Sequence, residues 1–180
     1  MNSLIRDLID GIGEDSCRRD LALTPQRVIN INREIYYGYN TLLPKVAKSF
    51  NASEFGVDIV YVKNVFFCSS CEHHMMPFFG VASLAYIPAE SVVGLSKVVD
   101  VLNCYSARLQ SQERLTYQVF SYIKHSLRPK AIVLRLECKH MCMITRGVKS
   151  VCAVSGSAIS AGVFNVSKTL LANVVNILAE

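Results

Sequence analysis

The sequence lacks tryptophan, and its 19 Lys and Arg residues lie scattered among 180 positions. A nucleic-acid-binding domain of this size usually clusters its basic residues and places exposed aromatic side chains among them. The composition therefore argues against a nucleic-acid partner. The formal net charge of +5 instead suits a small polyanionic ligand such as a nucleotide.

The sequence also lacks a segment typical of secretion or membrane insertion. Asp7 brings a negative charge into the first residues, and no apolar signal-peptide segment is present. The longest uncharged run, residues 150–167, is interrupted by Ser, Gly and Asn and predicts sheet and loop structure. Seven cysteines in such a chain favour the reducing cytosol, where Cys is more often a ligand or core residue than half of a disulfide. We expect a cytoplasmic protein without a membrane partner.

Apolar residues are abundant. They form 51% of the chain, and the mean hydropathy of +0.30 is high for a small soluble monomer. Because monomers seldom expose large apolar patches, this surplus indicates buried contacts between subunits. The length predicts one structural domain, and the sequence shows neither internal repeats nor low-complexity segments.

The first region, residues 2 to about 50, has the pattern of helices. Apolar residues recur at helical spacing at Leu4, Ile5, Leu8, Ile9 and Ile12. In the next segment Thr24 is a candidate N-cap, Pro25 suits the first helical position, and Gly38 is a candidate helix stop.

After Gly56 the pattern changes to strands. Two-residue alternation places one face of a strand at Val57, Ile59, Tyr61, Val65 and Phe67, with Lys63 interrupting it. Residues 81–87 form another candidate strand. Two helices are predicted next, marked by Leu95, Val98, Val99 and Leu102, and by Leu115, Val119, Tyr122 and Ile123 before the stop at Pro129.

A long strand is predicted from Ala131, and a short terminal helix from Lys168. Alternation in the strand puts Ile132, Leu134, Leu136, Cys138, His140 and Cys142 on one face, and Arg135, Glu137 and Lys139 on the other. The order of elements predicts an α+β fold with an antiparallel sheet.

A metal site is predicted from two short stretches that contain three of the four histidines. Cys71 and His74 have the Cys-x-x-His spacing with which one turn presents two zinc ligands, and the strand that carries Cys142 supplies a third. Three ligands leave one position of a tetrahedral ion for water, whose pKa the metal lowers toward neutrality. His73 and His140 then remain beside the metal for proton transfer.

The other cysteines and the fourth histidine have ordinary interpretations. Because Cys is among the most buried residue types, we expect Cys68, Cys104, Cys138 and Cys152 to be core or strand residues. His125, near the end of an apolar helix, is expected on the surface.

At these residues the chain resembles the GTP cyclohydrolase I family. The likeness covers about 140 residues, in order: LTPQRV (23–28), CSSCEHHMMPFFG (68–80), AYIP (85–88), GLSK (94–97), RLQSQERLTYQ (108–118), HMCMITRGV (140–148) and GVF (162–164). Motifs matching in order are far more specific than a lone Cys-x-x-His.

The resemblance implies a tunnelling fold, in which two helices pack on an antiparallel sheet and further helices precede it. Residues 1–50 would form the N-terminal helical region and residues 51–180 the catalytic domain, within a single structural domain overall. It also implies a homodecamer of two face-to-face pentamers, with active sites at subunit boundaries.

The implied activity is the zinc-dependent opening of the imidazole ring of GTP. Water activated by zinc on Cys71, His74 and Cys142 attacks guanine C8, and C8 leaves as formate. His73 would protonate the purine nitrogen N7, and His140 would transfer protons near the ribose. Ribose rearrangement and ring closure then give 7,8-dihydroneopterin triphosphate, the first step of tetrahydrofolate and pterin biosynthesis.

The resemblance assigns substrate contacts as well. Glu113 would recognise guanine through two parallel hydrogen bonds that adenine cannot offer, and Gln112 would help to position the base. The residue types alone favour a solvated helix start for this pair. The triphosphate would meet Ser96, Lys97, Arg146 and Arg27, with Arg27 coming from across a subunit boundary; a surface charge is the alternative for Arg27.

Two positions depart from the family pattern. Asp100 stands where an arginine is usual near the triphosphate, so the charge is reversed beside a polyanion unless Asp100 points away or pairs with a nearby base. In residues 155–158, Ser-Gly-Ser-Ala replaces a threonine-rich segment, and the hydroxyls of Ser155 and Ser157 can keep its hydrogen bonds.

Two alternatives remain. The chain can be a diverged paralogue that acts on another nucleotide or stops after ring opening, a hypothesis that only Asp100 supports. It can also be a non-catalytic, zinc-stabilised subunit, although such a site gains little from the two extra imidazoles of His73 and His140.

Overall fold

A computed structural model describes residues 1–46, 48–51 and 56–179. The helices are α1 (Asn2–Gly11), α2 (Thr24–Ile35), α3 (Leu95–Ser106), α4 (Gln112–Leu127), α5 (Met141–Ile144), α6 (Val163–Val166) and α7 (Lys168–Ala179), with 3-10 turns η1 (Arg19–Leu21) and η2 (Tyr37–Tyr39). The strands are β1 (Lys48–Asn51), β2 (Val60–Cys71), β3 (Pro77–Ile87), β4 (Ser91–Val93), β5 (Leu109–Gln110), β6 (Ala131–His140) and β7 (Ser155–Gly162).

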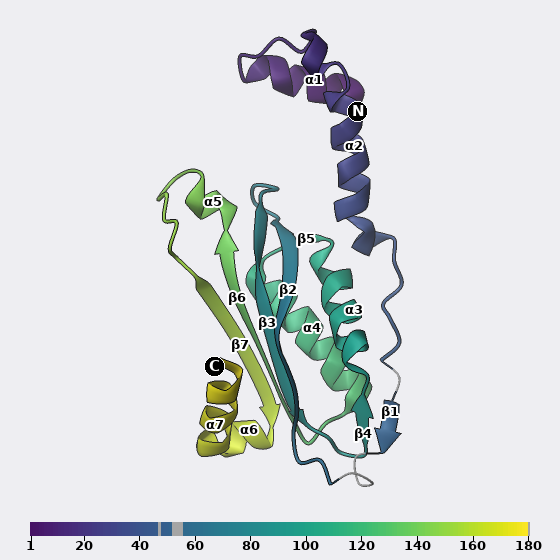
Figure 1. Ribbon diagram of the computed structural model, residues 1–180, viewed down its shortest axis with the longest axis vertical. Helices are drawn as coiled ribbons and strands as arrows, with labels where there is room; N and C mark the ends of the chain where they lie inside the picture. The colour runs from purple at the N-terminus through teal and green to yellow at the C-terminus, as the bar shows by residue number, and fades with distance from the viewer. Residues whose placement is uncertain (47, 52–55, 180) are drawn as a thin grey trace.

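The body of the protein is a five-stranded sheet in the order β5-β2-β3-β6-β7. Its long strands are antiparallel, and the short β5 is parallel to β2. Helices α3 and α4 cover one face, and α7 packs against the other (Figure 1). Strands β1 and β4 form a separate two-stranded sheet. The predicted α+β class with an antiparallel sheet is confirmed.

Strand β6 lies inside the sheet and is buried on both faces. On the side of α3 and α4, Ile132, Leu134 and Leu136 join the main core. On the side of α7, Ala131 and Val133 pack with residues of α6 and α7 in a second cluster. The predicted alternation from Ala131 is therefore correct. In the first half of the strand the residues on both faces are apolar and buried.

Strand β2 contains an irregularity that the alternation did not predict. Its pairing with β3 shifts register between Val62 and Val65, and Asn64 adopts a left-handed φ of 58°. Such a bulge reverses which residues face the core. Val62 packs against the core before the bulge and Val65 after it, whereas Tyr61, predicted on the buried face, is exposed.

Helix α4 has well-defined ends. The hydroxyl of Ser111 accepts a hydrogen bond from the backbone N–H of Arg114, an N-cap that fixes the first turn. At the other end Arg128 adopts the left-handed conformation, and Pro129 follows, as the predicted helix stop requires. The cap places Gln112 and Glu113 at the start of the helix.

Helices α1 and α2 extend beyond one end of the sheet (Figure 1). Pro25 stands in the first turn of α2 as predicted, but Thr24 is not the N-cap: the helix already begins at Thr24, and Leu23 occupies the N-cap position without a side-chain capping bond. No helix in the described ranges is long and apolar enough to cross a membrane. Residues 52–55, next to the predicted domain boundary, lie outside the described residues.

Gly38 does not stop α2, which ends earlier at Ile35. Its role is close packing against the end of α3: its N–H donates to the carbonyl of Ala107 at 3.1 Å. A Cβ atom at Gly38 would lie 2.2 Å from the carbonyl oxygen of Cys104. Only a residue without a side chain fits between these two segments.

We predict that Gly38→Ala lowers the free energy of unfolding by about 2 kcal/mol, because the backbone of η2 must move away from α3. Thermal and urea unfolding, followed by circular dichroism, measure the change. Gly11→Ala is the matched control, since no atom lies within 4 Å of its added Cβ. Equal stability of the two variants would contradict this packing role.

Candidate metal centre

The turn between β2 and β3 holds Cys71 and His74. Cys71 donates its backbone N–H to the carbonyl of Met76 at 2.8 Å, and its own carbonyl accepts from Met75 at 2.8 Å. Met75 has a left-handed φ of 53°, which turns the chain back into β3. This tight hairpin brings the side chains of Cys71 and His74 to the same side.

Cys142 reaches the site from α5 and not, as predicted, from the strand. Strand β6 ends at His140, and Cys142 lies in the four-residue helix that follows. Because Phe78 pairs with His140 across β3 and β6, the start of α5 lies beside the hairpin. The helical turn, rather than strand alternation, directs the Cys142 thiol inward.

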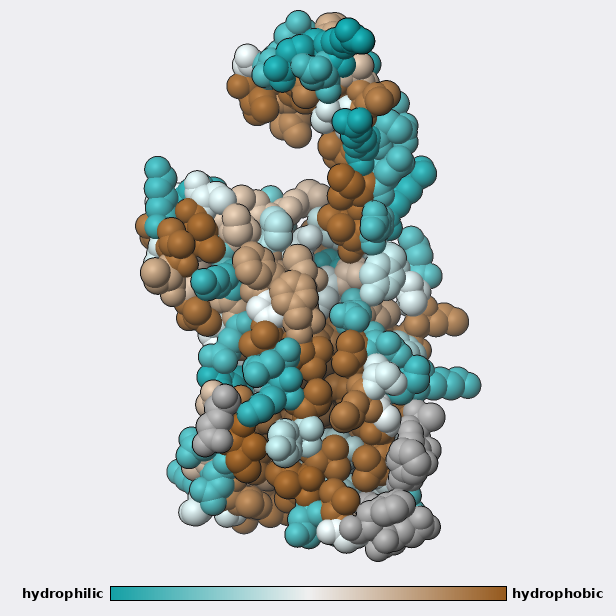
Figure 2. Space-filling model, viewed as in Figure 1, coloured by the Kyte–Doolittle hydropathy of each residue, from teal (hydrophilic) through white to brown (hydrophobic). Residues whose placement is uncertain are grey.

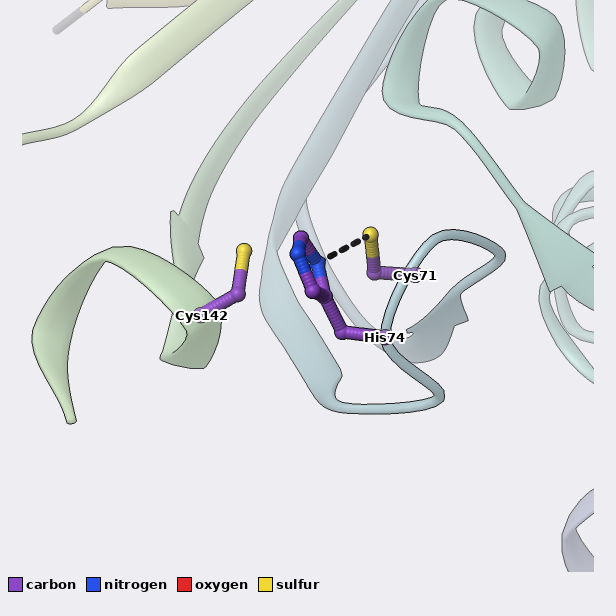
Figure 3. Close-up of side chains that lie close together, drawn as sticks. All are labelled: Cys71, His74 and Cys142. Carbon is purple, nitrogen blue, oxygen red and sulfur yellow. Dashed lines mark hydrogen bonds between the residues drawn. The ribbon is translucent and has the colours of Figure 1, made fainter. Parts of the chain in front are cut away.

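The three predicted ligand atoms converge. The sulfurs of Cys71 and Cys142 and a ring nitrogen of His74 all lie within 4.8 Å of one another (Figure 3). Cys71 Sγ is 3.8 Å from His74 Nδ1. Tetrahedral zinc, with bonds of about 2.3 Å to sulfur and about 2.0 Å to nitrogen, separates such atoms by roughly 3.5 Å. Both the donor types and their spacing fit a zinc ion.

The electrostatics of the two thiols also suit a cation. Burial raises the pKa of the Cys142 thiol, the adjacent Cys71 raises it further, and the charge of Arg146 acts in the opposite direction. Two thiolates at this distance repel each other, so a divalent cation between them is the natural counter-charge.

His73 lies beside the three ligands without belonging to their group. Its Nδ1 is 3.9 Å from Cys71 Sγ, but among the described residues only His74 forms a group with both sulfurs. Its Nε2 is 4.0 Å from a carboxylate oxygen of Glu72, and Glu72 is paired with Arg114. His73 is 71% exposed and accessible to a ligand.

His140 is held more firmly. Its ring stacks on Phe78, with centroids 5.0 Å apart and planes 8° from parallel. Its Nε2 lies 3.0 Å from Oε1 of Gln112. Burial lowers the pKa of His140, while the nearby charge of Glu113 opposes this shift. The net effect is a lowered pKa, which favours the neutral form of the imidazole.

Gln112 and Glu113 have different surroundings although they are neighbours. Gln112 is only 3% exposed, and its amide hydrogen-bonds to β6 and β7. Glu113 is exposed, and its charge acts on His140. The same charge and burial help to raise the pKa of the Cys138 thiol to about 12, burial having the larger effect. The charge of Glu113 is therefore close enough to act on both His140 and Cys138.

Of the four residues predicted to contact phosphate, only Arg146 lies near this centre. Arg146 lies close to it, since its charge acts on Cys142. Ser96 and Lys97 occupy the first turn of α3, whose last residue, Ser106, bonds through its carbonyl to Ser69 near the hairpin. A helix rises 1.5 Å per residue, so Ser96 is about 15 Å further along α3. Arg27 lies on α2, which extends away from the sheet (Figure 1).

Asp100 pairs with Lys97. Its carboxylate lies 2.8 Å from Lys97 Nζ, one turn along α3. The condition set by the sequence, that Asp100 either turns away or pairs with a base, is therefore met by pairing. The two hydroxyls of the altered segment also keep hydrogen bonds, with Ser155 donating to Gln112 and Ser157 lying 2.7 Å from Thr116 Oγ1.

The remaining cysteines follow the expectation in part. Cys104 and Cys138 are buried, and Cys68 lies in β2 although its side chain is exposed. Cys152 is exposed in the loop before β7, so its assignment to core or strand is wrong. His125 is exposed as predicted.

Sequence patterns did not single out two further contacts at the site. One is the stacking of Phe78 on His140, and the other is the pairing of Glu72 with Arg114. Both join segments far apart in the chain, so no local pattern signals them. Phe78 does lie within the matched motif of residues 68–80.

An α+β chain that brings two thiols and an imidazole around one point, with further imidazoles beside them, offers the ligands of the open metal sites that hydrolases use. The family profile for GTP cyclohydrolase I matches residues 1–179. The chain belongs to the GTP cyclohydrolase I family, whose members are hydrolases.

Several relatives named GTP cyclohydrolase 1 cover most of the chain. The protein of Chlorobaculum tepidum is 40% identical over 94% of this chain and 75% of its own length. The protein of Bacteroides fragilis is 40% identical over 91% of this chain and 84% of its own length. The protein of Rickettsia felis is 34% identical over 98% of this chain and 93% of its own length. Among solved structures, an apo crystal structure of the archaeosine synthase QueF-Like aligns with a TM-score of 0.48 at 16% identity, over 59% of this chain and 95% of that one.

We predict that Cys142→Ala loses bound zinc while its circular dichroism spectrum stays unchanged, because one of three ligands is removed from the end of the sheet. Metal analysis after dialysis measures the loss. Cys152→Ala, an exposed cysteine outside the ligand group, is the matched control and should keep its zinc. Full zinc content in Cys142→Ala would contradict the assigned ligand set.

Proposed function

We propose that the protein is a zinc-dependent GTP cyclohydrolase I, which opens the guanine imidazole ring at C8, releases formate and forms 7,8-dihydroneopterin triphosphate. The observation that carries the proposal is the convergence of Cys71, His74 and Cys142 in a chain of this family. On this proposal the product enters tetrahydrofolate and pterin biosynthesis.

The metal requirement rests on the donor set. Cys71 and His74 come from one rigid hairpin and Cys142 from an adjacent helix, so the ligands are positioned before an ion binds. Zinc held by three protein ligands lowers the pKa of a water in its fourth position and thereby supplies a nucleophile near neutral pH.

The two remaining imidazoles have environments suited to proton transfer. His73 is exposed beside the ligands, where it protonates N7 as the C8–N bond opens. His140, whose pKa is lowered by burial and whose ring stacks on Phe78, accepts and returns protons near the ribose. A neutral imidazole at pH 7 can act as a general base, which an imidazolium cannot.

Guanine recognition is assigned to the first turn of α4. The exposed carboxylate of Glu113 accepts two parallel hydrogen bonds from guanine N1–H and the exocyclic amine. Gln112 helps to position the base because its buried amide anchors the turn that carries Glu113. Adenine presents an acceptor at N1 and would leave the carboxylate unpaired.

The phosphate contacts support an active site shared between subunits. Arg146 can meet a phosphate next to the zinc ligands, but Ser96 and Lys97 are about a helix length away on the same chain. A neighbouring copy could supply Ser96, Lys97 and Arg27 to the same GTP molecule. This arrangement agrees with the boundary position that the family resemblance implies.

Two surfaces support such an assembly. Among the described residues, the β2 edge from Val60 to Ser69 and the outer edge of β7 have no strand partner in the sheet. Open edges of this kind pair with strands of other chains, and head-to-tail pairing closes into rings. The facing sides of α1 and α2 are also hydrophobic (Figure 2) and line a 460 Å³ cavity.

We therefore propose a tunnelling fold in residues 51–180, preceded by the helical region of residues 1–50, and assembly into a decamer of two pentamers. The proposed location is the cytoplasm, and GTP is the proposed partner molecule. Two alternatives remain. One is a diverged paralogue that acts on another nucleotide or stops after ring opening, and the other is a non-catalytic subunit stabilised by zinc.

We predict that the zinc-loaded protein converts GTP to formate and a fluorescent pterin in equal amounts. Formate is measured by an enzyme-coupled assay and the pterin by fluorescence after oxidation. Cys142→Ala is the inactive control. Formate without fluorescence would identify an arrested reaction, and the absence of both with zinc bound would favour a non-catalytic subunit.

We predict that Asp100→Asn lowers the Michaelis constant for GTP about fivefold, because removing one negative charge near the phosphates is worth roughly 1 kcal/mol. Asp100→Arg should lower it further. Steady-state kinetics at two ionic strengths measure the effect, which salt should weaken. Asp7→Asn on α1 makes the same charge change elsewhere and is the control. Equal Michaelis constants for GTP in Asp100→Asn and Asp7→Asn would exclude a phosphate site at Lys97.

A further inference from the structure

Behind His140 lies a partly buried polar network, and the role assigned to Gln112 does not explain its contact with His140. It consists of Gln112 on α4 and of Ser155 and Ser157 on β7. We infer that this network is a positioning device, which fixes the orientation and the tautomer of His140. The inference rests on the proposed function, because it assigns a purpose to the proton-transfer role of His140.

The hydrogen bonds determine which way the Gln112 amide points. Its Nε2 lies 3.3 Å from the carbonyl oxygen of Leu136 and 3.2 Å from that of Ser155. A backbone carbonyl can only accept, so the NH₂ group must face these two oxygens. The amide oxygen then faces His140, with Oε1 and the ring Nε2 3.0 Å apart.

The amide oxygen in turn determines the tautomer of His140. Because Oε1 only accepts, Nε2 of His140 must carry the hydrogen. A neutral imidazole has one N–H, so its other nitrogen, Nδ1, holds the free lone pair. The network therefore presents Nδ1 as the proton-accepting atom.

Ser155 completes the arrangement. Its hydroxyl donates to Oε1 of Gln112 and fills the second lone pair of that oxygen. Ser157 lies 3.1 Å from Gln112 Nε2 and 2.7 Å from Thr116 Oγ1. With these bonds the Gln112 amide has used its capacity within the protein, so it acts on the substrate only through other residues.

The ring plane is fixed from another side. The stacked Phe78 is fully buried and pairs with His140 in the β3–β6 ladder. Stacking restrains the tilt of the imidazole, and the bond to Gln112 restrains its rotation. Together they hold the imidazole in one orientation before the substrate arrives, which is the condition for efficient proton transfer.

The experiment compares two serines on the same strand. Ser155→Ala removes the donor to Gln112, whereas Ser160→Ala removes a hydroxyl that bonds only to the exposed side chain of Asn165. In the zinc-loaded protein we expect Ser155→Ala to lower kcat for GTP about tenfold, as for loss of one hydrogen bond in a buried network. The Michaelis constant should change less than about twofold, because the effect falls on proton transfer and not on binding. Ser155→Thr restores a hydroxyl and should restore kcat.

A spectroscopic measurement separates positioning from loss of structure. The ¹⁵N shifts of the two ring nitrogens of His140, assigned by their absence in His140→Ala, report which nitrogen carries the hydrogen. We expect a single Nε2–H tautomer in the wild type and in Ser160→Ala, and a mixture of tautomers in Gln112→Leu. Zinc content and circular dichroism of each variant verify the fold.

The outcomes distinguish this inference from the proposed function. Wild-type protein that binds zinc but releases no formate from GTP would refute the proposed function. Active wild-type protein with unchanged kcat in Ser155→Ala would refute the positioning role. The same conclusion would follow from a mixture of His140 tautomers in the wild type, or from equal kcat losses in Ser155→Ala and Ser155→Thr.

Discussion

The pairing of β3 with both of its neighbours is the constraint on which the site depends. At its beginning β3 pairs Pro77 with Ser70 of β2, and one residue later it pairs Phe78 with His140 of β6. This register brings Cys71 and Cys142 together although 70 residues separate them in sequence. A slip of one residue between β3 and β6 would turn His140 to the opposite face and move α5 away from the hairpin. The apolar residues of β6, buried on both faces, make such a slip costly.

Buried polar groups beside this part of the sheet contribute both to stability and to the geometry of the site. A buried amide such as that of Gln112 is unfavourable unless its hydrogen bonds are satisfied, and here they connect α4 to β6 and β7. The bonds that fasten the first turn of α4 to the sheet therefore also set the position of Glu113 relative to His140. In this arrangement the sheet is the scaffold for both the metal ligands and the proposed guanine contact.

Most of the fold and the convergence of the three candidate metal ligands could be predicted from the sequence, because they follow from spacing. Alternation predicts β6, and helical periodicity together with Pro129 predicts α4. Spacing could not show where β6 ends, since Cys142 continues the same alternation although it is the second residue of α5. The bulge at Asn64 depends on a single left-handed residue, and Gly38 is required by a contact with α3 that only the folded chain creates. The network behind His140 is tertiary, so its serines could be identified only as possible hydrogen-bonding residues.

The geometry of α3 gives the proposed function a physical reason for assembly. One end of the helix is tied to the hairpin through Ser106 and Ser69, and the other carries Ser96 and Lys97. A continuous helix cannot fold back, so Lys97 lies about a helix length from the hairpin of its own chain. On the proposed function a neighbouring chain would bring Lys97 to the triphosphate, and the edges of β2 and β7 that lack a strand partner among the described residues offer such a chain a place to pair. An incoming phosphate at that boundary would compete with Asp100 for Lys97, so the proposal makes substrate binding depend on the charge of this one carboxylate.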